Sequence, residues 1–318
     1  MKKVLLASTM LVATGGMAAA DVTFGGYGRF GILYEEDRGA GAEEETRVES
    51  RYRLNIDAST ETDAGIRFAA RIRVEANENA DNSANQGAFS GARFQVSSGG
   101  LRVRVGNVSG VTDAAEVVDY FGFEPGLVGQ TGQYANSGVS LPAFSSTGAG
   151  NNGINVKYEF GDFAVMASYT DDHSVNDGGT IGTTVAFGDS YELGASYNFG
   201  GWTAGVVVAQ FEAAGGAAAT SDFYLATLSG TIGIADVSFL VSDFEADDDV
   251  VIGASTSIPV GAATNIVASI SDGGEDANDT SYGLGFTHSL GGGVKLSGMV
   301  GSNADSNTIA DLGVRFDF

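Results

Sequence analysis

The 318-residue sequence has no cysteine, three prolines and two histidines, and its 16 basic residues face 40 acidic ones. Without cysteine, a disulfide framework and thiol chemistry are excluded. The net charge of −24 repels the phosphates of nucleic acids, so nucleic-acid binding is excluded as well. Beyond residue 20 no run of 18 apolar residues occurs, so no membrane-spanning helix is expected. The 48 glycines disfavour helices at about 1 kcal/mol each, so the composition favours β structure.

The first 20 residues differ from the rest. Two lysines are followed by an apolar run over residues 4–12 and then by three alanines that end at residue 20. This is the layout of a secretory signal peptide with a small-residue cleavage site. A transmembrane helix is the alternative, but the run is too short and Gly15 and Gly16 interrupt it. We therefore expect residues 1–20 to be a signal peptide and residues 21–318 to form the exported protein.

Apolar and polar residues alternate with a period of two along most of the chain. In residues 46–58, TRVESRYRLNIDA, valine, tyrosine, leucine and isoleucine occupy one parity, and arginine, glutamate, asparagine and aspartate occupy the other. This alternation is typical of strands and not of helices. Sixteen segments of this kind are predicted: 22–35, 46–60, 64–79, 87–98, 101–107, 153–161, 162–172, 189–199, 201–212, 220–231, 234–245, 249–258, 261–271, 279–290, 293–302 and 308–318.

The lengths of these segments and of their connections predict an all-β transmembrane antiparallel barrel of about 16 strands. Many segments reach the ten residues that a tilted strand needs to cross a bilayer. Short turns, such as 161–162 and 200–201, alternate with long polar loops, such as 35–46 and 171–189, as in outer-membrane barrels. A soluble β-sandwich has similar alternation and is the main alternative. A calcium-binding solenoid is disfavoured because no G-G-x-G-x-D repeat occurs.

A G-x-G-x-x-G sequence is formed by Gly26, Gly28 and Gly31. A dinucleotide-binding turn would need a strand before it and a helix after it. The motif instead lies inside an alternating segment that follows the predicted cleavage site. We therefore assign these glycines to strand curvature or to close approach of the backbone.

The last segments carry a family resemblance. The sequences SLGGGVKLSGMVG (289–301) and ADLGVRFDF (310–318), together with the Asp-Val after the predicted cleavage site, resemble the general diffusion porins of alphaproteobacteria, the Rhodobacter-type family. The terminal Phe318 is similar to the C-terminal assembly signal of bacterial outer-membrane proteins. The resemblance implies sixteen strands, a homotrimer in the outer membrane of a Gram-negative bacterium, contact with membrane lipid and lipopolysaccharide, and a long third loop folded into the lumen.

Arginines gather in the first third of the chain on the polar parity of five consecutive segments. In a barrel this parity faces the lumen, because a charge that faces lipid at the midplane costs about 2–4 kcal/mol. We therefore predict a positive wall on one arc of the lumen. Its members are Arg29, Arg47, Arg51, Arg53, Arg67, Arg71, Arg73, Arg93, Arg102 and Arg104.

Residues 107–152 break the alternation and form a connection long enough to be functional or disordered. Residues 113–121 are expected to form a short helix, with Asp113 and Glu116 spaced as a capping box. By the resemblance this is the infolded constriction loop. Its carboxylates would face the positive wall, and opposed charges at a narrow point are a selectivity device in pores. The alternative is that the arginines are structural, paired with Glu49, Asp57 and Glu75, and that the segment is a surface flap. The loop carboxylates are Asp113, Glu116, Asp119 and Glu124.

Other candidate sites are weaker. His173 and His288 are not expected to form a metal pair, and no G-x-S-x-G sequence supports a serine nucleophile. Acidic clusters in predicted loops, including residues 43–45, are ordinarily solvated charge. They are also candidates for Ca²⁺ or Mg²⁺, which prefer oxygen ligands and could bridge loops or lipopolysaccharide. The candidate calcium ligands are Asp247, Asp248, Asp249, Asp272, Glu275 and Asp276. No other cofactor is expected.

The sequence therefore predicts a passive, water-filled outer-membrane channel for small hydrophilic solutes and ions, since barrels of 16–18 strands leave an aqueous lumen. No enzymatic activity is expected. Two alternatives stay open: a substrate-specific channel, which saturable block would reveal, and a structural or adhesive surface barrel, which would not conduct.

Overall fold

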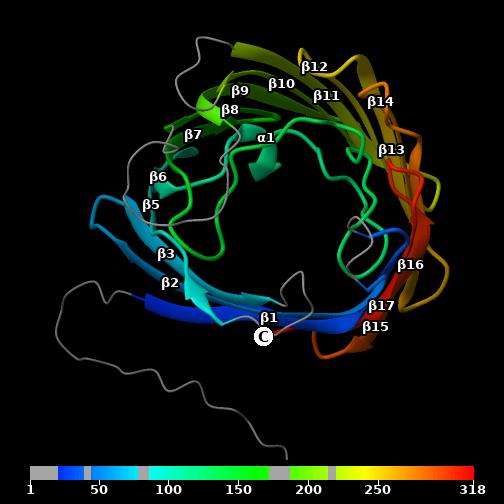
Figure 1. Cartoon of the computed structure of the whole chain (residues 1–318). Coiled ribbons are helices and arrows are strands. Elements are labelled where there is room, and N and C mark those ends of the chain that lie inside the picture. Colours follow the sequence, from blue (N-terminus) through cyan, green and yellow to red (C-terminus); the bar gives the residue numbers. More distant parts are fainter. Residues whose placement is uncertain (1–20, 39–43, 78–85, 172–186, 214–219) are drawn as a thin grey trace, which may run out of the picture.

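The computed structural model describes residues 21–38, 44–77, 86–171, 187–213 and 220–318. The predicted signal peptide, residues 1–20, lies outside the described residues. Across the described residues, seventeen antiparallel strands form one sheet that closes into a ring (Figure 1). The strands are β1 (Asp21–Glu35), β2 (Thr46–Glu61), β3 (Arg67–Asn77), β4 (Ala88–Phe89), β5 (Arg93–Ser98), β6 (Leu101–Asn107), β7 (Asn152–Phe160), β8 (Phe163–Asp171), β9 (Phe187–Phe199), β10 (Trp202–Ala213), β11 (Thr220–Ile232), β12 (Ala235–Phe244), β13 (Asp249–Pro259), β14 (Thr264–Gly274), β15 (Ser281–Gly291), β16 (Val294–Ser302) and β17 (Thr308–Asp317).

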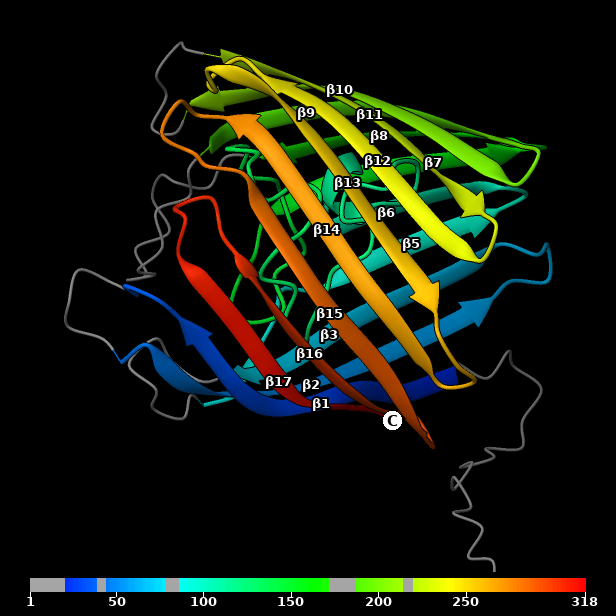
Figure 2. The same cartoon turned by 90° about the vertical axis from the view of Figure 1, so that its right-hand side faces the viewer.

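The ring corresponds to a sixteen-stranded barrel. The short β4 and the longer β5 both pair with β3, so they form one interrupted strand. Each strand pairs with its neighbours in sequence, and β1 closes the ring by pairing with both β2 and β17. The strands are tilted relative to the barrel axis (Figure 2). The predicted fold class and the number of strands are thus confirmed, although several bounds differ by a few residues: the predicted segment 261–271, for example, is β14 at Thr264–Gly274.

The period-two pattern places apolar side chains outside the barrel. In β11, Tyr224 is 50% exposed and Leu228 is 37% exposed. Phe223, which has the opposite parity in the same strand, is fully buried. The same alternation holds in β5, where Phe94 and Val96 are exposed. A closed ring with an apolar outer face is the form in which strands can cross a lipid bilayer, because every strand has two hydrogen-bonded neighbours.

Two kinds of connection alternate around the ring. The turns after β7 and β9 are two-residue turns, and their glycines, Gly161, Gly200 and Gly201, have positive φ values of 60°, 55° and 83°. The end of β17 lies at the same end of the barrel as these short turns (Figure 2), where the Asp317 N–H donates to the carbonyl of Gly293. The β6–β7 connection is the long segment that the sequence predicted to break the pattern.

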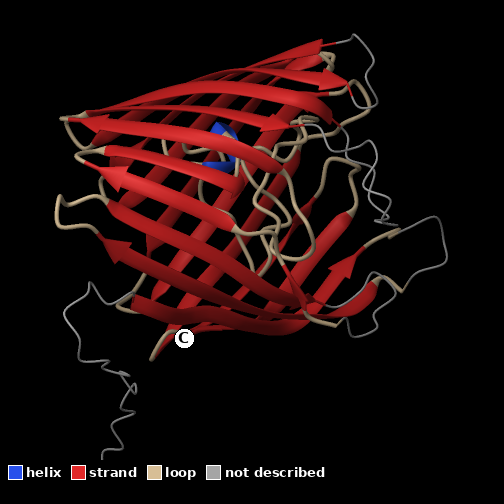
Figure 3. Cartoon of the chain, turned by 90° about the vertical axis from the view of Figure 1, so that its left-hand side faces the viewer, coloured by secondary structure: helices blue, strands red, loops and turns tan. Residues whose placement is uncertain are grey.

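Helix is scarce in the described residues. The short helix α1 (Val111–Ala114) lies inside the wall of strands (Figure 3). Across residues 21–38, 44–77, 86–171, 187–213 and 220–318, no helix has the length and apolar character needed to cross a membrane.

The predicted helix over residues 113–121 was wrong in its bounds, and so was the capping box. Gly110 precedes α1 without a side-chain cap, and Asp113 lies within the helix. Ala115 adopts a left-handed conformation, φ 50°, which ends the helix. Val117, Val118 and Tyr120 are then all buried. Packing of these side chains on the barrel wall overrides the local preference for helix.

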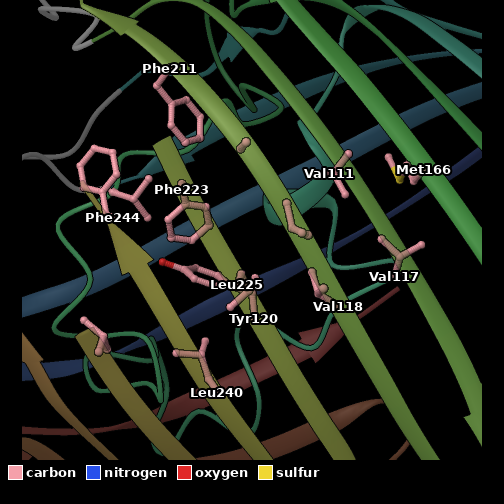
Figure 4. Packing of buried hydrophobic residues seen from close by; sticks show 14 residues of the cluster. Val111, Val117, Val118, Tyr120, Met166, Phe211, Phe223, Leu225, Leu240 and Phe244 are labelled. Atoms are coloured by element: carbon pink, nitrogen blue, oxygen red, sulfur yellow. The ribbon is translucent and has the colours of Figure 1, made fainter. Parts of the chain in front are cut away.

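The hydrophobic core lies inside the barrel and joins the β6–β7 connection to the wall. Val111, Val117, Val118 and Tyr120 of the connection pack against inward side chains of β8, β10, β11, β12 and β13 (Figure 4). The wall side chains of this cluster are Met166, Val207, Ala209, Phe211, Phe223, Leu225, Leu240, Phe244 and Val251. The loop therefore fills one side of the lumen, and this packing is stabilised because apolar side chains of both the loop and the wall are removed from water.

Candidate functional site: the lumen loop and the arginine wall

Residues 108–151, which we call the lumen loop, run inside the ring of strands along β8–β13 and toward β16 and β17 (Figure 1). The predicted segment 107–152 differs only by its two end residues, which belong to β6 and β7. The other side of the lumen is lined by β1, β2, β3, β5 and β6, which carry the predicted arginines, and we call this lumen-facing side the arginine wall. The fold therefore places the loop on one half of the lumen and most of the basic residues on the other.

Two buried wall carboxylates hold the backbone of the lumen loop. Glu192 in β9 accepts hydrogen bonds from the Thr112 N–H at 2.8 Å and from its hydroxyl at 2.7 Å. Asp311 in β17 accepts the Leu127 N–H at 2.8 and 2.9 Å through its two oxygens. Glu192 is 4% exposed and Asp311 is 6% exposed. Hydrogen bonds between a charged group and a buried N–H are strong, so these contacts fix the first half of the loop at two points.

Small wall residues let the loop backbone come close. A Cβ atom at Gly253 in β13 would lie 1.7 Å from the carbonyl oxygen of Gln133, and one at Gly205 in β10 would lie 2.2 Å from that of Val117. The Gln133 side chain donates to Ser238 at 3.1 Å and accepts from Ser255 at 2.9 Å. The loop is thus seated where the wall has glycine and serine.

Four of the predicted wall arginines pair with carboxylates on the wall itself. The Arg29 guanidinium bonds Glu49, and that of Arg53 bonds Glu75. Arg51 lies 3.8 Å from Glu75. These pairs agree with the structural alternative for this part of the wall.

The fourth of these pairs joins Arg71 and Asp57. The guanidinium of Arg71 bonds both oxygens of Asp57, at 2.6 and 3.0 Å. The two residues lie opposite each other on adjacent strands, Asp57 on β2 and Arg71 on β3, with both side chains on the polar parity.

Two other arginines pair with the lumen loop. Glu116 accepts from Arg104 Nη1 at 2.6 Å and from Arg102 Nη2. Lys157 in β7 lies 3.4 Å from the same carboxylate and 2.6 Å from Glu159. Glu116 thus contacts three cations on β6 and β7, which joins the start of the loop to the basic wall.

Arg73 and Arg93 lie beside the end of the loop. A cavity of about 390 Å³ between loop and wall is lined by four arginines, Arg53, Arg73, Arg93 and Arg104, and by Asp113, Glu116 and Phe144 of the loop. The guanidinium carbon of Arg73 is 4.4 Å from the centroid of the Phe144 ring, and that of Arg93 is 5.6 Å from it.

The remaining predicted site residues lie elsewhere. Arg47 is half-buried in β2, and Arg67 is exposed at the start of β3, where it donates to Ser59 at 3.2 Å. Asp119 accepts the Gly122 N–H at 3.2 Å within the loop. Glu124 accepts the hydroxyl of Tyr134 at 2.8 Å. The structure therefore brings Asp113 and Glu116 to the arginines of β3–β6, but it does not bring Asp119 there.

The loop carboxyls have different proton affinities. Burial raises the pKa of Asp113, although the neighbouring Ser109 hydroxyl and Phe144 N–H counteract it. Enclosure by the barrel also raises the pKa of Glu124, although its side chain is exposed to the lumen and hydrogen-bonded by Tyr134. Burial acts on Glu116 in the same direction, but Arg104 and Arg102 outweigh it and lower its pKa. Glu116 therefore keeps its charge to lower pH than the other two.

Several of the candidate calcium ligands accept hydrogen bonds from nearby loop residues. Asp247 accepts the Gly138 N–H at 3.1 Å, Asp248 accepts the Asp276 N–H at 2.9 Å, and Asp272 accepts the Thr280 hydroxyl at 2.5 Å. In the part of the chain that the structure describes, no group of three or more histidine, aspartate and glutamate side chains is placed to hold a metal ion.

Three further predictions concern single residues. His288 contacts the Thr264 hydroxyl at 2.7 Å, and His173 and Glu43 lie outside the described residues. Phe318 exchanges backbone hydrogen bonds with Gly26, at 2.9 and 3.0 Å, and its ring stacks on Tyr52 with centroids 5.7 Å apart. A Cβ atom at Gly26 would lie 1.9 Å from the Arg53 carbonyl oxygen, so this glycine serves close backbone approach, as predicted.

Sequence reasoning missed the residues that hold the loop. Lys157, Glu192 and Asp311 share the lumen parity of their strands, and that parity was a usable signal. Phe144 had none, because a phenylalanine in an irregular segment does not indicate a cation partner.

Comparisons with known proteins agree with the fold. A family model described as Gram-negative porin matches residues 7–308. The chain is 33% identical over 312 residues to the porin of Fuscovulum blasticum and 26% identical over 331 residues to that of Rhodobacter capsulatus, in each case covering 94% of this chain and all of the relative. It is also similar to solved mutants of Rh. blastica porin, one with a TM-score of 0.78 at 28% identity and another with 0.77 at 29%, each covering 94% of this chain and all of the other.

Proposed function

Since the chain belongs to the Gram-negative porin family, we propose that the lumen loop and the arginine wall form the constriction of a water-filled channel for passive diffusion of small hydrophilic solutes and ions. The protein is an outer-membrane β-barrel porin, as its sequence resemblance predicted. Sixteen strands leave room for an aqueous lumen. The proposal adds which residues narrow that lumen and set its charge.

One observation carries the proposal: Asp113 and Glu116 of the lumen loop face Arg53, Arg73, Arg93 and Arg104 of the wall. Carboxylates on one side and guanidinium groups on the other create a field across the lumen. Such a field orders water and orients dipolar solutes. An apolar solute cannot replace the interactions of the water that it displaces, so it is penalised.

The role of the wall is tested by neutralising Arg51, Arg53, Arg71 and Arg73 together with glutamine. We expect altered single-channel conductance and a shift of ion preference toward cations, measured in planar bilayers under a salt gradient. Lys295→Gln is the matched control, because it removes an exposed base of β16 near the β15–β16 turn. Unchanged conductance and preference in the quadruple variant would contradict the assignment.

We further propose that transport involves no catalytic step, that the protein is a homotrimer in contact with lipid and lipopolysaccharide, and that it is exported by cleavage after residue 20. The exposed apolar outer faces of β1–β5 support contact with lipid and with other copies. Cross-linking in native membranes and N-terminal sequencing of the mature protein test these points; a monomer, or a start other than Asp21, would contradict them.

A further inference from the structure

The cavity between the lumen loop and β2, β3, β5 and β6 has more cations than anions. Four guanidinium groups line it, against the carboxylates of Asp113 and Glu116. Glu116 is already shared by Arg102, Arg104 and Lys157. The cavity therefore has excess positive charge within a barrel whose total charge is strongly negative.

Arg73 and Arg93 account for this excess. Neither forms an ion pair with any carboxylate of the described residues, in contrast to Arg53 and Arg104, which pair with Glu75 and Glu116. Arg73 donates to the neutral oxygens of Asn55 at 2.7 Å and Ser146 at 3.2 Å. Like charges held together in an enclosed site repel, so an added anion would be stabilised there.

The two guanidinium groups also keep unused hydrogen-bond donors. A guanidinium has five N–H donors. Arg73 uses two of them, on Asn55 and Ser146. Arg93 donates a side-chain hydrogen bond to no group of the described residues, and its guanidinium lies over the ring of Phe144. A tetrahedral or planar oxyanion can accept two parallel N–H bonds from one guanidinium fork through two of its oxygens, a match that the single-atom chloride ion does not offer.

Phe144 fixes the spacing of this pair. Its ring contacts both guanidinium groups, at 4.4 and 5.6 Å, and its N–H donates to Ser109 at 3.0 Å. The next residue is fixed too, because the Ser145 N–H donates to Asn107 at 2.9 Å. Arg73 and Arg93 are thus held in place before any ligand arrives, which lowers the entropy cost of binding.

We propose that Arg73 and Arg93, with Phe144 beside both, form a binding site for small oxyanions, whose phosphate or carboxylate group takes the free N–H donors. The proposal rests on the channel function proposed above and refines it. A solute with this group pauses in the constriction, so its passage saturates with concentration, whereas chloride passes without saturation. Four surrounding guanidinium groups exclude a cation as the occupant.

The test is block of chloride current in planar bilayers. Wild-type channels in potassium chloride are titrated with inorganic phosphate and, separately, with succinate, at constant ionic strength. We expect a saturable fall in current with either probe. Arg93→Gln and, independently, Arg73→Gln should raise the half-blocking concentration about tenfold, which corresponds to 1.4 kcal/mol. Arg93→Lys should weaken block less than Arg93→Gln, since it keeps the charge but loses the planar fork.

Arg67→Gln is the matched control, because Arg67 lies in the same strand as Arg73 but outside the cavity. Phosphate and succinate should block this variant at the same concentrations as the wild type. Absence of any chloride current in the wild type would overturn the channel function itself. Normal chloride current without saturable block, or block that is as strong in both glutamine variants as in the wild type, would overturn the oxyanion site alone. Block by phosphate but not by succinate, or the reverse, would overturn the common site for both anions.

Discussion

Glu116 of the lumen loop accepts a hydrogen bond from Arg104 of β6 at 2.6 Å, and this ion pair joins the loop to the wall that it faces. Arg102 and Lys157 contact the same carboxylate, so three wall cations share the charge of one loop residue. The loop side of the constriction therefore depends on Glu116 more than on any other of its acids.

Replacing Glu116 by glutamine should shift the ion preference toward anions, because three cations lose their common counter-charge. The reversal potential under a potassium chloride gradient measures this shift. Glu159→Gln is the control, since Glu159 also contacts Lys157 but is exposed and not on the loop. Equal shifts of the reversal potential in the two variants would contradict the assignment of Glu116 as the main counter-charge of these cations.

Acidification should move the preference in the same direction. Burial raises the pKa values of Asp113 and Glu124, so both bind protons at higher pH than ordinary carboxyls as the pH falls, and the loop loses negative charge. The pKa of Glu116 is lowered, so this carboxylate stays charged longer. We expect anion preference to rise on mild acidification, and the double variant Asp113→Asn, Glu124→Gln to lack the early part of that rise. A rise of the same size in both proteins would contradict the assignment.

Loss of the buried carboxylate at Glu192 should loosen the loop. Glutamine keeps one oxygen that can accept the two hydrogen bonds from Thr112 but removes the charge, and a hydrogen bond to a charged group contributes about 1.5–3 kcal/mol, against about 0.5–1.5 kcal/mol for a neutral one. Limited proteolysis of the loop and current noise of open channels measure the effect. Glu212→Gln, in β10, serves as the control. Equal protease resistance in Glu192→Gln and the wild type would show that this carboxylate is dispensable.

Gly253→Ala should displace the loop. The new Cβ would lie 1.7 Å from the Gln133 carbonyl oxygen, and overpacking of this kind costs about 1–3 kcal/mol. Gly261→Ala is the matched control, because a Cβ atom at Gly261 would have no other atom within 4 Å and the φ of this residue is not positive. Unfolding in detergent by heat should separate the two variants; identical midpoints would contradict the close seating of the loop.

Calcium binding at Asp247, Asp248, Asp249, Asp272, Glu275 and Asp276 stays a prediction. A ligand that binds only the folded state raises its thermal midpoint with concentration. Titration of calcium against the unfolding temperature tests the hypothesis, with Asp248→Asn as the comparison. An unchanged midpoint up to millimolar calcium would remove it.

The sequence predicted the barrel well because the outer face is set by a local pattern. Each strand shows its apolar parity independently, as Tyr224 and Leu228 do in β11. The lumen parity was harder, because Phe223 and Leu225 make both faces of β11 apolar where the loop covers them. Only the folded barrel brings these side chains to Val118 and Tyr120, which lie about a hundred residues away in sequence.

The candidate site was predicted in part for a similar reason. The arginines could be found because they share parity over neighbouring strands. Their partners could not all be found, because an ion pair such as Arg104 with Glu116 depends on the path of an irregular loop. The helix predicted over 113–121 was wrong since the packing of Val117 and Val118, not local propensity, decides that path.

The seam between β1 and β17 has a consequence for biogenesis. Phe318 exchanges two backbone hydrogen bonds with Gly26, so the first strand finds its second neighbour only when the last strand arrives. Until then, β1 has one open edge, and open strand edges invite pairing with other chains. The ring thus closes only after the whole polypeptide is available, and until then every intermediate with an unpaired strand edge has to be kept from pairing with other copies of the chain.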